Sequence, residues 1–123
     1  MIKVAIIEDD PAINQMYRMK FENEGFNVRL ASDGKTGFEL VKSFKPDIIL
    51  LDLQMPEVSG TDSLRKIRNE EWGKDIPVII LTNLGEEESP KEIKELNIET
   101  YIVKADLTPR QVVANVKESL GIE

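Results

Sequence analysis

Five short apolar runs, each separated from the next by a stretch with helical spacing, most restrict what this chain can fold into. The runs span residues 2–7, 28–31, 47–53, 77–82 and 101–103. They are rich in Ile, Val and Leu and show no clean alternation of polar and apolar residues, which is typical of strands buried on both faces of a sheet. The stretches between them carry apolar residues three or four positions apart, which predicts amphipathic helices.

The residues that begin helices agree with this reading. Asp10-Pro11 and Thr108-Pro109 each place a capping side chain before a proline at the first helical position. Ser89-Pro90 does the same, and Glu92 adds the second half of a capping box. The sequence therefore predicts five strands alternating with five helices, the fourth of which begins at Pro90.

Strict alternation of strands and helices predicts an α/β fold. The strands form one parallel sheet, the connections are right-handed crossovers, and helices cover both faces. A chain of 123 residues is long enough for one core, and we expect a single domain over residues 1–123. Ligands of such sheets bind at the carboxyl ends of the strands, near the point where the strand order reverses.

Composition excludes several kinds of chemistry. The chain has no Cys and no His, which removes disulfides, thiol and Ser-His-Asp catalysis, and thiolate or imidazole metal sites. The 23 acidic against 16 basic residues give a net charge of −7, which disfavours direct binding to nucleic acid or to anionic membranes. Neither a signal-peptide pattern nor an apolar run of membrane-spanning length is visible, so we expect a cytoplasmic protein.

Chemically capable residues follow four of the predicted strands. Glu8, Asp9 and Asp10 stand at the end of the first, Asp52 at the end of the third, Thr82 at the end of the fourth, and Lys104 just after the fifth. We interpret Asp10, which precedes Pro11, as a helix cap. Clustered carboxylates without His or Cys favour a hard cation, Mg²⁺ or Mn²⁺. Asp52 could then act as a nucleophile toward a phosphoryl group, whose oxygens Thr82 and Lys104 would bind.

The segment over residues 47–60 is the most specific part of the chain. A hydrophobic strand is followed by Asp52, then Leu-Gln, Met55-Pro56 and Gly60. With the acidic pair after the first strand, Thr82 and Lys104, this resembles the receiver domain of two-component response regulators of the chemotaxis-regulator type, over the whole chain. The resemblance implies a doubly wound, flavodoxin-like (βα)5 fold with strand order 2-1-3-4-5.

The resemblance also implies roles for individual residues around a metal ion. Asp52 resembles the phosphoacceptor of the family. Asp9 resembles the direct ligand of Mg²⁺, and Glu8 the acid that acts mostly through a metal-bound water. The backbone carbonyl of Gln54 would be a further metal contact.

A second group of residues resembles the switch of these domains. Thr82 and Lys104 correspond to the groups that bind the phosphoryl oxygens, and Tyr101 to the aromatic side chain that rotates inward when Thr82 moves. Asn83 follows the switch residue where family members usually have a small one, and it would narrow access to Asp52. Gln54 and Leu84 offer no charged group that could activate water, so we expect slow self-dephosphorylation.

One departure from the family pattern concerns the peptide bond after Lys104. The family usually has proline at the next position, often with a cis bond, whereas this chain has Ala105. A non-proline cis bond costs about 3–4 kcal/mol. Either this bond is trans, with Lys104 placed differently, or the site is strained.

These residues predict a phosphorylation-driven signalling switch rather than an enzyme. Because the chain has no His, a histidine kinase or a histidine phosphotransfer protein must supply the phosphoryl group. Phosphorylation would rearrange the face made by the fourth helix, the fifth strand and the fifth helix. That face would contact a downstream protein, an effector domain or a second copy of the chain.

Three other functions remain as alternatives. An aspartate-nucleophile phosphatase would need an acid where Gln54 stands. A flavin or nucleotide site would need free amides in a Gly- or Ser/Thr-rich loop where this chain has Glu8-Asp9-Asp10-Pro11. A receiver-like module that is never phosphorylated is disfavoured by the intact Asp52 and Lys104.

Overall fold

The computed structural model describes residues 1–55 and 57–122. Its core is a five-stranded parallel sheet in the order β2-β1-β3-β4-β5. The strands are β1 (Lys3–Ile7), β2 (Asn27–Ala31), β3 (Ile48–Leu51), β4 (Val78–Thr82) and β5 (Thr100–Val103). Each predicted strand is confirmed, with its ends within two residues of the expected positions.

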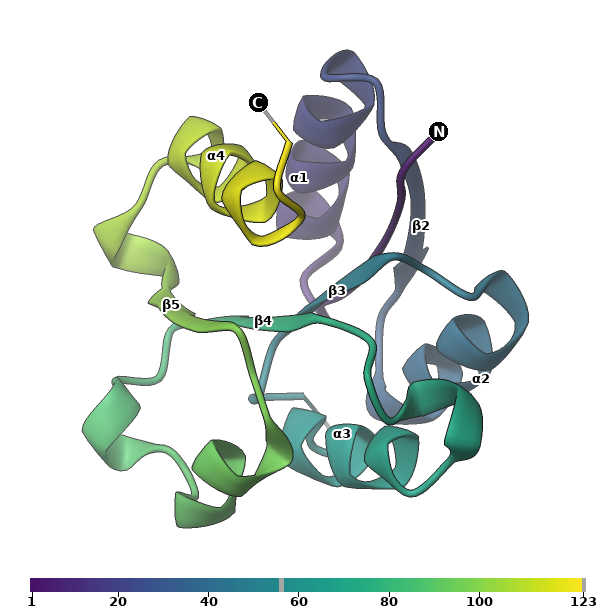
Figure 1. The fold of residues 1–123 in the computed structure, drawn as a ribbon. Coiled ribbons are helices and arrows are strands. Elements are labelled where there is room, and N and C mark those ends of the chain that lie inside the picture. The colour runs from purple at the N-terminus through teal and green to yellow at the C-terminus, as the bar shows by residue number, and fades with distance from the viewer. Residues whose placement is uncertain (56, 123) are drawn as a thin grey trace.

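Helices cover both faces of the sheet, as Figure 1 shows. Helices α1 (Pro11–Asn23) and α4 (Pro109–Ser119) lie on one face, and α2 (Gly34–Phe44) and α3 (Gly60–Arg68) on the other. Successive residues of a strand point to opposite faces of the sheet and so belong to two different apolar layers. In β1, Val4 and Ile6 pack toward α1 and α4, and Ala5 and Ile7 pack toward α2 and α3. Both layers are needed because the central strands have no exposed face, which is why their sequences are almost wholly apolar.

The crossover from β4 to β5 differs from the others. It contains two 3₁₀ helices, η2 (Glu86–Glu88) and η3 (Lys91–Leu96), in place of an α-helix. The capping box predicted for Ser89 and Glu92 is wrong, because the Ser89 hydroxyl donates to the carbonyl of Glu86 at 2.6 Å and so closes η2 instead. Only Ile93 of η3 is buried, and a segment this short and this little buried gains too little from packing to complete an α-helix.

The end of α3 is held by one side chain. The guanidinium of Arg68 donates hydrogen bonds to five backbone carbonyl groups, those of Gly73, Lys74, Ile76, Leu96 and Asn97, at 2.8–3.2 Å. These acceptors belong to the connection before β4 and to the end of η3. Arg68 therefore joins the end of α3 both to the connection that follows it and to the end of η3, which is distant in the sequence.

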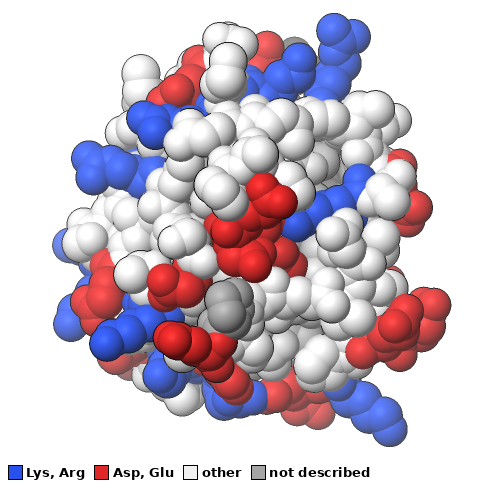
Figure 2. Space-filling view, turned by 180° about the vertical axis from the view of Figure 1, so that it is seen from behind, with Lys and Arg blue, Asp and Glu red and all other residues white. Residues whose placement is uncertain are grey.

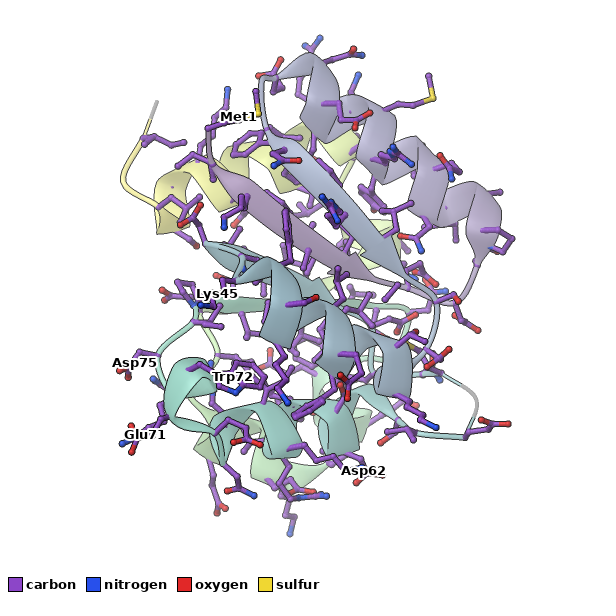
Figure 3. All side chains as sticks on the ribbon, turned by 90° about the vertical axis from the view of Figure 1, so that its right-hand side faces the viewer. Met1, Lys45, Asp62, Glu71, Trp72 and Asp75 are labelled. Atoms are coloured by element: carbon purple, nitrogen blue, oxygen red, sulfur yellow. The ribbon has the colours of Figure 1, made fainter. Side chains whose placement is uncertain are left out.

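The same edge of the molecule contains the single tryptophan. Trp72 lies in the 3₁₀ helix η1 (Glu71–Gly73) and packs against Phe38 of α2, with ring centroids 5.4 Å apart. Figure 3 shows it beneath α2.

Among the helices of the described ranges, none is both long and apolar enough to cross a membrane.

The start of α4 offers a direct test of helix capping. The Thr108 hydroxyl accepts from the Gln111 amide at 3.2 Å, and the Gln111 side chain accepts from the Thr108 amide at 2.8 Å. Replacing Thr108 with alanine is expected to lower the free energy of unfolding by about 1 kcal/mol, because one amide of the first turn loses its acceptor. Urea denaturation measures this, and Thr108→Ser should keep most of the stability; equal stability of all three proteins would contradict the capping role.

Candidate functional site

The register of the parallel strands brings the predicted site residues to one edge of the sheet. Ile7 pairs with Leu51, so Glu8 and Asp52 leave neighbouring strands at the same level. Thr82 pairs with Val103, which places Lys104 immediately beyond the end of β4. Figure 2 shows this side of the molecule, where acidic side chains gather near the middle of the face. The strand ends therefore converge as the sequence predicts.

Three carboxylates form what we call the acidic cluster: Glu8, Asp9 and Asp52. Each offers one oxygen, and these atoms all lie within 4.8 Å of one another. Glu8 and Asp52 are buried, with 4% and 5% of their surface exposed, whereas Asp9 is exposed. Two of its three carboxylates are therefore shielded from solvent, and the third faces solvent. Carboxylate oxygens of this kind are suitable ligands for a hard divalent cation.

Lys104 reaches into the acidic cluster from the end of β5. Its ammonium lies 3.1 Å from Asp52 Oδ2 and also forms an ion pair with Glu8 Oε1. Burial by itself would lower the pKa of Lys104, but the hydrogen bond to Glu8 and the charges of Asp52 and Glu8 outweigh it, so the pKa is raised. Lys104 therefore stays charged and balances part of the negative charge of the cluster.

The surroundings of Glu8 disfavour its charged form. Burial raises its pKa above the ordinary value, and the nearby charge of Asp52 raises it further. Hydrogen bonds from the Asp10 amide, at 3.0 Å, and from Lys104 act in the opposite direction without cancelling the rise. A bound cation would favour the charged form of Glu8, because it would offset the loss of hydration on burial and balance the charge of Asp52.

Both oxygens of Asp52 are fixed. Oδ1 accepts a hydrogen bond from the Gln54 amide at 3.0 Å, and Oδ2 accepts one from Lys104 at 3.1 Å. The carboxylate is therefore oriented by the loop that follows β3 and by the end of β5. Gln54, whose carbonyl is the predicted further metal contact, lies in this same loop after β3.

Thr82 and Tyr101 are the other two residues of the predicted switch. Thr82 is fully buried at the end of β4, and its hydroxyl accepts from the Leu84 amide at 3.4 Å. Tyr101 is half-buried, and its hydroxyl donates to the carbonyl of Leu84 at 2.8 Å. Burial is the main cause that raises the pKa of Tyr101. The loop after β4 therefore connects Thr82 and Tyr101 through Leu84.

The remaining predicted residues have simpler surroundings. Asn83 and Gln54 are exposed and Leu84 is half-buried. The peptide bond between Lys104 and Ala105 is trans, and Lys104 still contacts Asp52 and Glu8. Of the two alternatives, the trans bond is the one present, and Lys104 contacts both carboxylates with it. Pro56 lies outside the described residues.

One residue of the site was missed by the sequence reasoning. Asn14, in the first turn of α1, is buried, and its side-chain amide donates to the carbonyls of Glu8 and Ala31 at 2.8 and 3.2 Å. The signal was present, because position 14 shares the buried stripe of Tyr17 and Phe21. A polar residue in an apolar helical stripe indicates a specific hydrogen bond.

Comparison with known proteins also relates this chain to receiver domains. Residues 4–117 match the family model described as "Response regulator receiver domain". The chain is 36% identical over 104 residues to the DNA-binding dual master transcriptional regulator RpaA of Synechocystis, and 36% identical over 118 residues to the transcriptional regulatory protein SrrA of Staphylococcus aureus. These matches cover 85% and 96% of this chain but only 43% and 47% of the relatives, so the chain spans about half their length.

Solved structures share the fold. The chemotaxis protein CheY4 of Vibrio cholerae superposes with a TM-score of 0.88 at 24% identity, over 96% of this chain and 98% of that one. The receiver domain of a sensor histidine kinase from Pseudomonas aeruginosa, solved with a magnesium ion in its active site cleft, gives 0.85 at 21% identity over 98% of each chain. With this fold, the acidic cluster at its strand ends and the match over residues 4–117, the chain belongs to the receiver domains of two-component response regulators.

Proposed function

We propose that this receiver domain accepts a phosphoryl group on Asp52 and thereby switches a protein-binding face. The observation that carries the proposal is the fixed carboxylate of Asp52, held by the Gln54 amide and by Lys104 beside the open side of the acidic cluster. Such pre-orientation removes the cost of positioning the nucleophile at the moment of reaction. The proposal includes a single domain over residues 1–123 and a cytoplasmic location.

The acidic cluster would hold the divalent cation that this reaction requires. Glu8, Asp9 and Asp52 would contribute carboxylates, with Glu8 acting through water, and Gln54 its backbone carbonyl. Mg²⁺ is the preferred ion, and Mn²⁺ suits the same oxygen ligands. When bound, the ion would neutralise negative charge on the incoming phosphoryl group. The magnesium ion in the active site cleft of the related sensor-kinase receiver supports this assignment.

The chain's own residues would carry out the transfer. A carboxylate oxygen of Asp52 attacks the phosphorus atom of a phosphohistidine, the P–N bond breaks, and the histidine nitrogen keeps the electron pair. Because this chain has no His, the donor is a histidine kinase or a histidine phosphotransfer protein. Lys104 and the Thr82 hydroxyl would then bind oxygens of the new phosphoryl group.

The switch would follow from the link between Thr82 and Tyr101. Movement of Thr82 toward the phosphoryl group would pull on the loop whose Leu84 carbonyl now accepts from Tyr101. The released ring could turn inward and alter the face formed by η3, β5 and α4. We propose this face as the contact surface for a downstream protein, an effector domain or a second copy of the chain, by shifting an equilibrium that already exists.

A mass measurement tests the central step. The protein is incubated with Mg²⁺ and a small-molecule phosphodonor, and we expect a mass gain of one phosphoryl group that disappears in Asp52→Asn. Asp75→Asn removes an exposed aspartate far along the chain and should leave the adduct unchanged. An adduct that persists in Asp52→Asn would move the acceptor to another residue.

Two other outcomes would favour the alternative functions. Failure of the wild-type protein to gain mass with any phosphodonor or kinase would indicate a receiver-like module that is not phosphorylated. Steady turnover of a phosphate ester, with many products per protein molecule, would indicate an aspartate-nucleophile phosphatase.

The phosphorylated protein is expected to lose its phosphoryl group slowly. Neither the exposed Gln54 nor the half-buried Leu84 offers a charged group that could activate water, and the exposed Asn83 would narrow the approach to Asp52. After the donor is removed, the phosphorylated fraction should decay over minutes or longer, followed by mass. A decay that is complete within seconds would contradict this prediction, and Asn83→Ala should accelerate the loss.

A further inference from the structure

Asn14 connects the first turn of α1 to the ends of two strands. Both hydrogens of its side-chain amide are used: one hydrogen bond goes to the carbonyl of Glu8 at 2.8 Å and the other to the carbonyl of Ala31 at 3.2 Å. The Ala31 carbonyl also accepts from the Glu8 amide at 3.0 Å. The carbonyl of Glu8 is therefore held by the Asn14 side chain, and the amide of Glu8 by the Ala31 carbonyl that Asn14 also binds.

These bonds fix the backbone on either side of Asp9. On the one side Glu8 is held through its carbonyl by the Asn14 side chain, and on the other the backbone amide of Asn14 donates to the carbonyl of Asp10 at 2.9 Å. The Asp10 side chain in turn caps α1, accepting from Ala12 at 2.9 Å. Asp9 is the exposed member of the acidic cluster. Its backbone lies between Glu8 and Asp10, which are both held by hydrogen bonds, and this backbone determines the direction of the Asp9 carboxylate.

A purely structural role does not account well for this residue. Asn14 is 5% exposed, and its Oδ1 is a buried oxygen without a hydrogen-bond partner among the described residues. An unpaired buried acceptor costs about 1–3 kcal/mol. Tyr17 and Phe21 fill the same stripe of α1 with apolar groups, so an apolar side chain at position 14 would suit the core better.

We propose that Asn14 is a positioning residue of the metal site, which sets the separation and direction of the Glu8 and Asp9 carboxylates by joining the ends of β1 and β2 to α1. This inference rests on the proposed function, because it concerns the cation that the acidic cluster is proposed to hold. Residues that orient metal ligands without touching the ion commonly change metal affinity 10–100-fold when they are replaced. Asn14 reaches the ligands through the Glu8 carbonyl, and it has no contact with the ion itself.

The test is the affinity for Mg²⁺ of the unphosphorylated protein, measured by titration of backbone amide resonances. Asn14→Leu keeps the number and branching of the side-chain heavy atoms and removes the donor, and Asn14→Ala is a smaller second variant in case the first does not fold. Both are expected to weaken Mg²⁺ binding at least tenfold. The free energy of unfolding, measured without Mg²⁺ by urea denaturation, reports separately on any loss of stability.

Ser63→Ala is the matched control. Ser63 is fully buried, and its hydroxyl donates to the carbonyl of Gly34 at 3.0 Å, so it joins α3 to α2 rather than to the acidic cluster. This variant should lose stability while keeping the wild-type Mg²⁺ affinity. Wild-type Mg²⁺ affinity in a folded Asn14 variant would overturn the positioning role and leave the proposed function intact. Absence of Mg²⁺ binding in the wild-type protein would instead overturn both.

Discussion

Replacing Lys104 with methionine is expected to lower the free energy of unfolding by about 3 kcal/mol at neutral pH in the absence of divalent cations. Methionine keeps most of the side-chain length and removes the ammonium that faces Glu8 and Asp52. Only 10% of the Lys104 side chain and 5–6% of its partners' side chains are exposed, so water cannot replace the lost charge. Urea denaturation without metal measures the loss.

Lys117→Met is the matched control for this prediction. Lys117 pairs with Glu24 at 2.7 Å, but the two side chains are 25% and 46% exposed. An ion pair of this kind contributes at most about 1 kcal/mol, because water screens it. Equal losses in Lys104→Met and Lys117→Met would contradict the idea that burial makes the first ion pair important.

The repulsion within the acidic cluster gives a second check on the same variant. Asp52→Asn removes the charge that Lys104 would have balanced, so the double variant Lys104→Met, Asp52→Asn should regain part of the stability that Lys104→Met alone loses. Mg²⁺ should also stabilise Lys104→Met more than the wild-type protein, because the ion then replaces the only cation of the cluster. Simple additivity of the two substitutions would show that Lys104 and Asp52 are not coupled.

Replacing Gly60 with alanine is expected to destabilise the protein by about 3 kcal/mol, although alanine is the better helix former by about 1 kcal/mol. Gly60 is the first residue of α3, and its amide donates to the Leu53 carbonyl at 3.2 Å. A Cβ atom at this position would lie 2.0 Å from the backbone oxygen of Asp52 and 2.8 Å from Leu53 Cα. Backbone cannot yield as a flexible side chain can, so α3 must move away from the loop that carries Asp52.

Gly85→Ala separates this clash from the general effect of removing a glycine. The nearest atoms that its Cβ would meet belong to the Glu88 and Glu87 side chains, at 3.2 and 3.4 Å, and both side chains can move aside. We expect its stability to stay within about 0.5 kcal/mol of the wild type. Thermal unfolding of the two variants gives the comparison, and a stable Gly60→Ala would mean that α3 and the Asp52 loop are not rigidly packed together.

Much of the site could be predicted because parallel strands bring their carboxyl ends together whatever their separation in sequence. Glu8, Asp52, Thr82 and Lys104 could therefore be grouped before any coordinates were known, and the family resemblance supplied the strand order. The convergence of these four strand ends depends on register, which the apolar runs determine.

Other features depend on three-dimensional packing and could not be read from the chain. The capping box predicted for Ser89 and Glu92 does not form: the Ser89 hydroxyl closes η2 instead, and the segment that follows buries only Ile93. The trans bond before Ala105 still brings Lys104 to the cluster, since the whole η4 turn (Lys104–Asp106) positions it. The role of Asn14 could not be predicted, because its two acceptors, Glu8 just after β1 and Ala31 at the end of β2, are identified only once the strands are adjacent.

The five carbonyl groups bound by Arg68 determine how the crossover between β4 and β5 can move. Its last residues, Leu96 and Asn97, are anchored to the end of α3, and a displacement there would leave several acceptors unpaired at once. Its first residues, Glu86–Glu88, are exposed and lie next to the loop that joins Thr82 to Tyr101. A displacement of the loop beside Asp52 is therefore expected to move Glu86–Glu88 further than Leu96 and Asn97, which the hydrogen bonds from Arg68 hold in place.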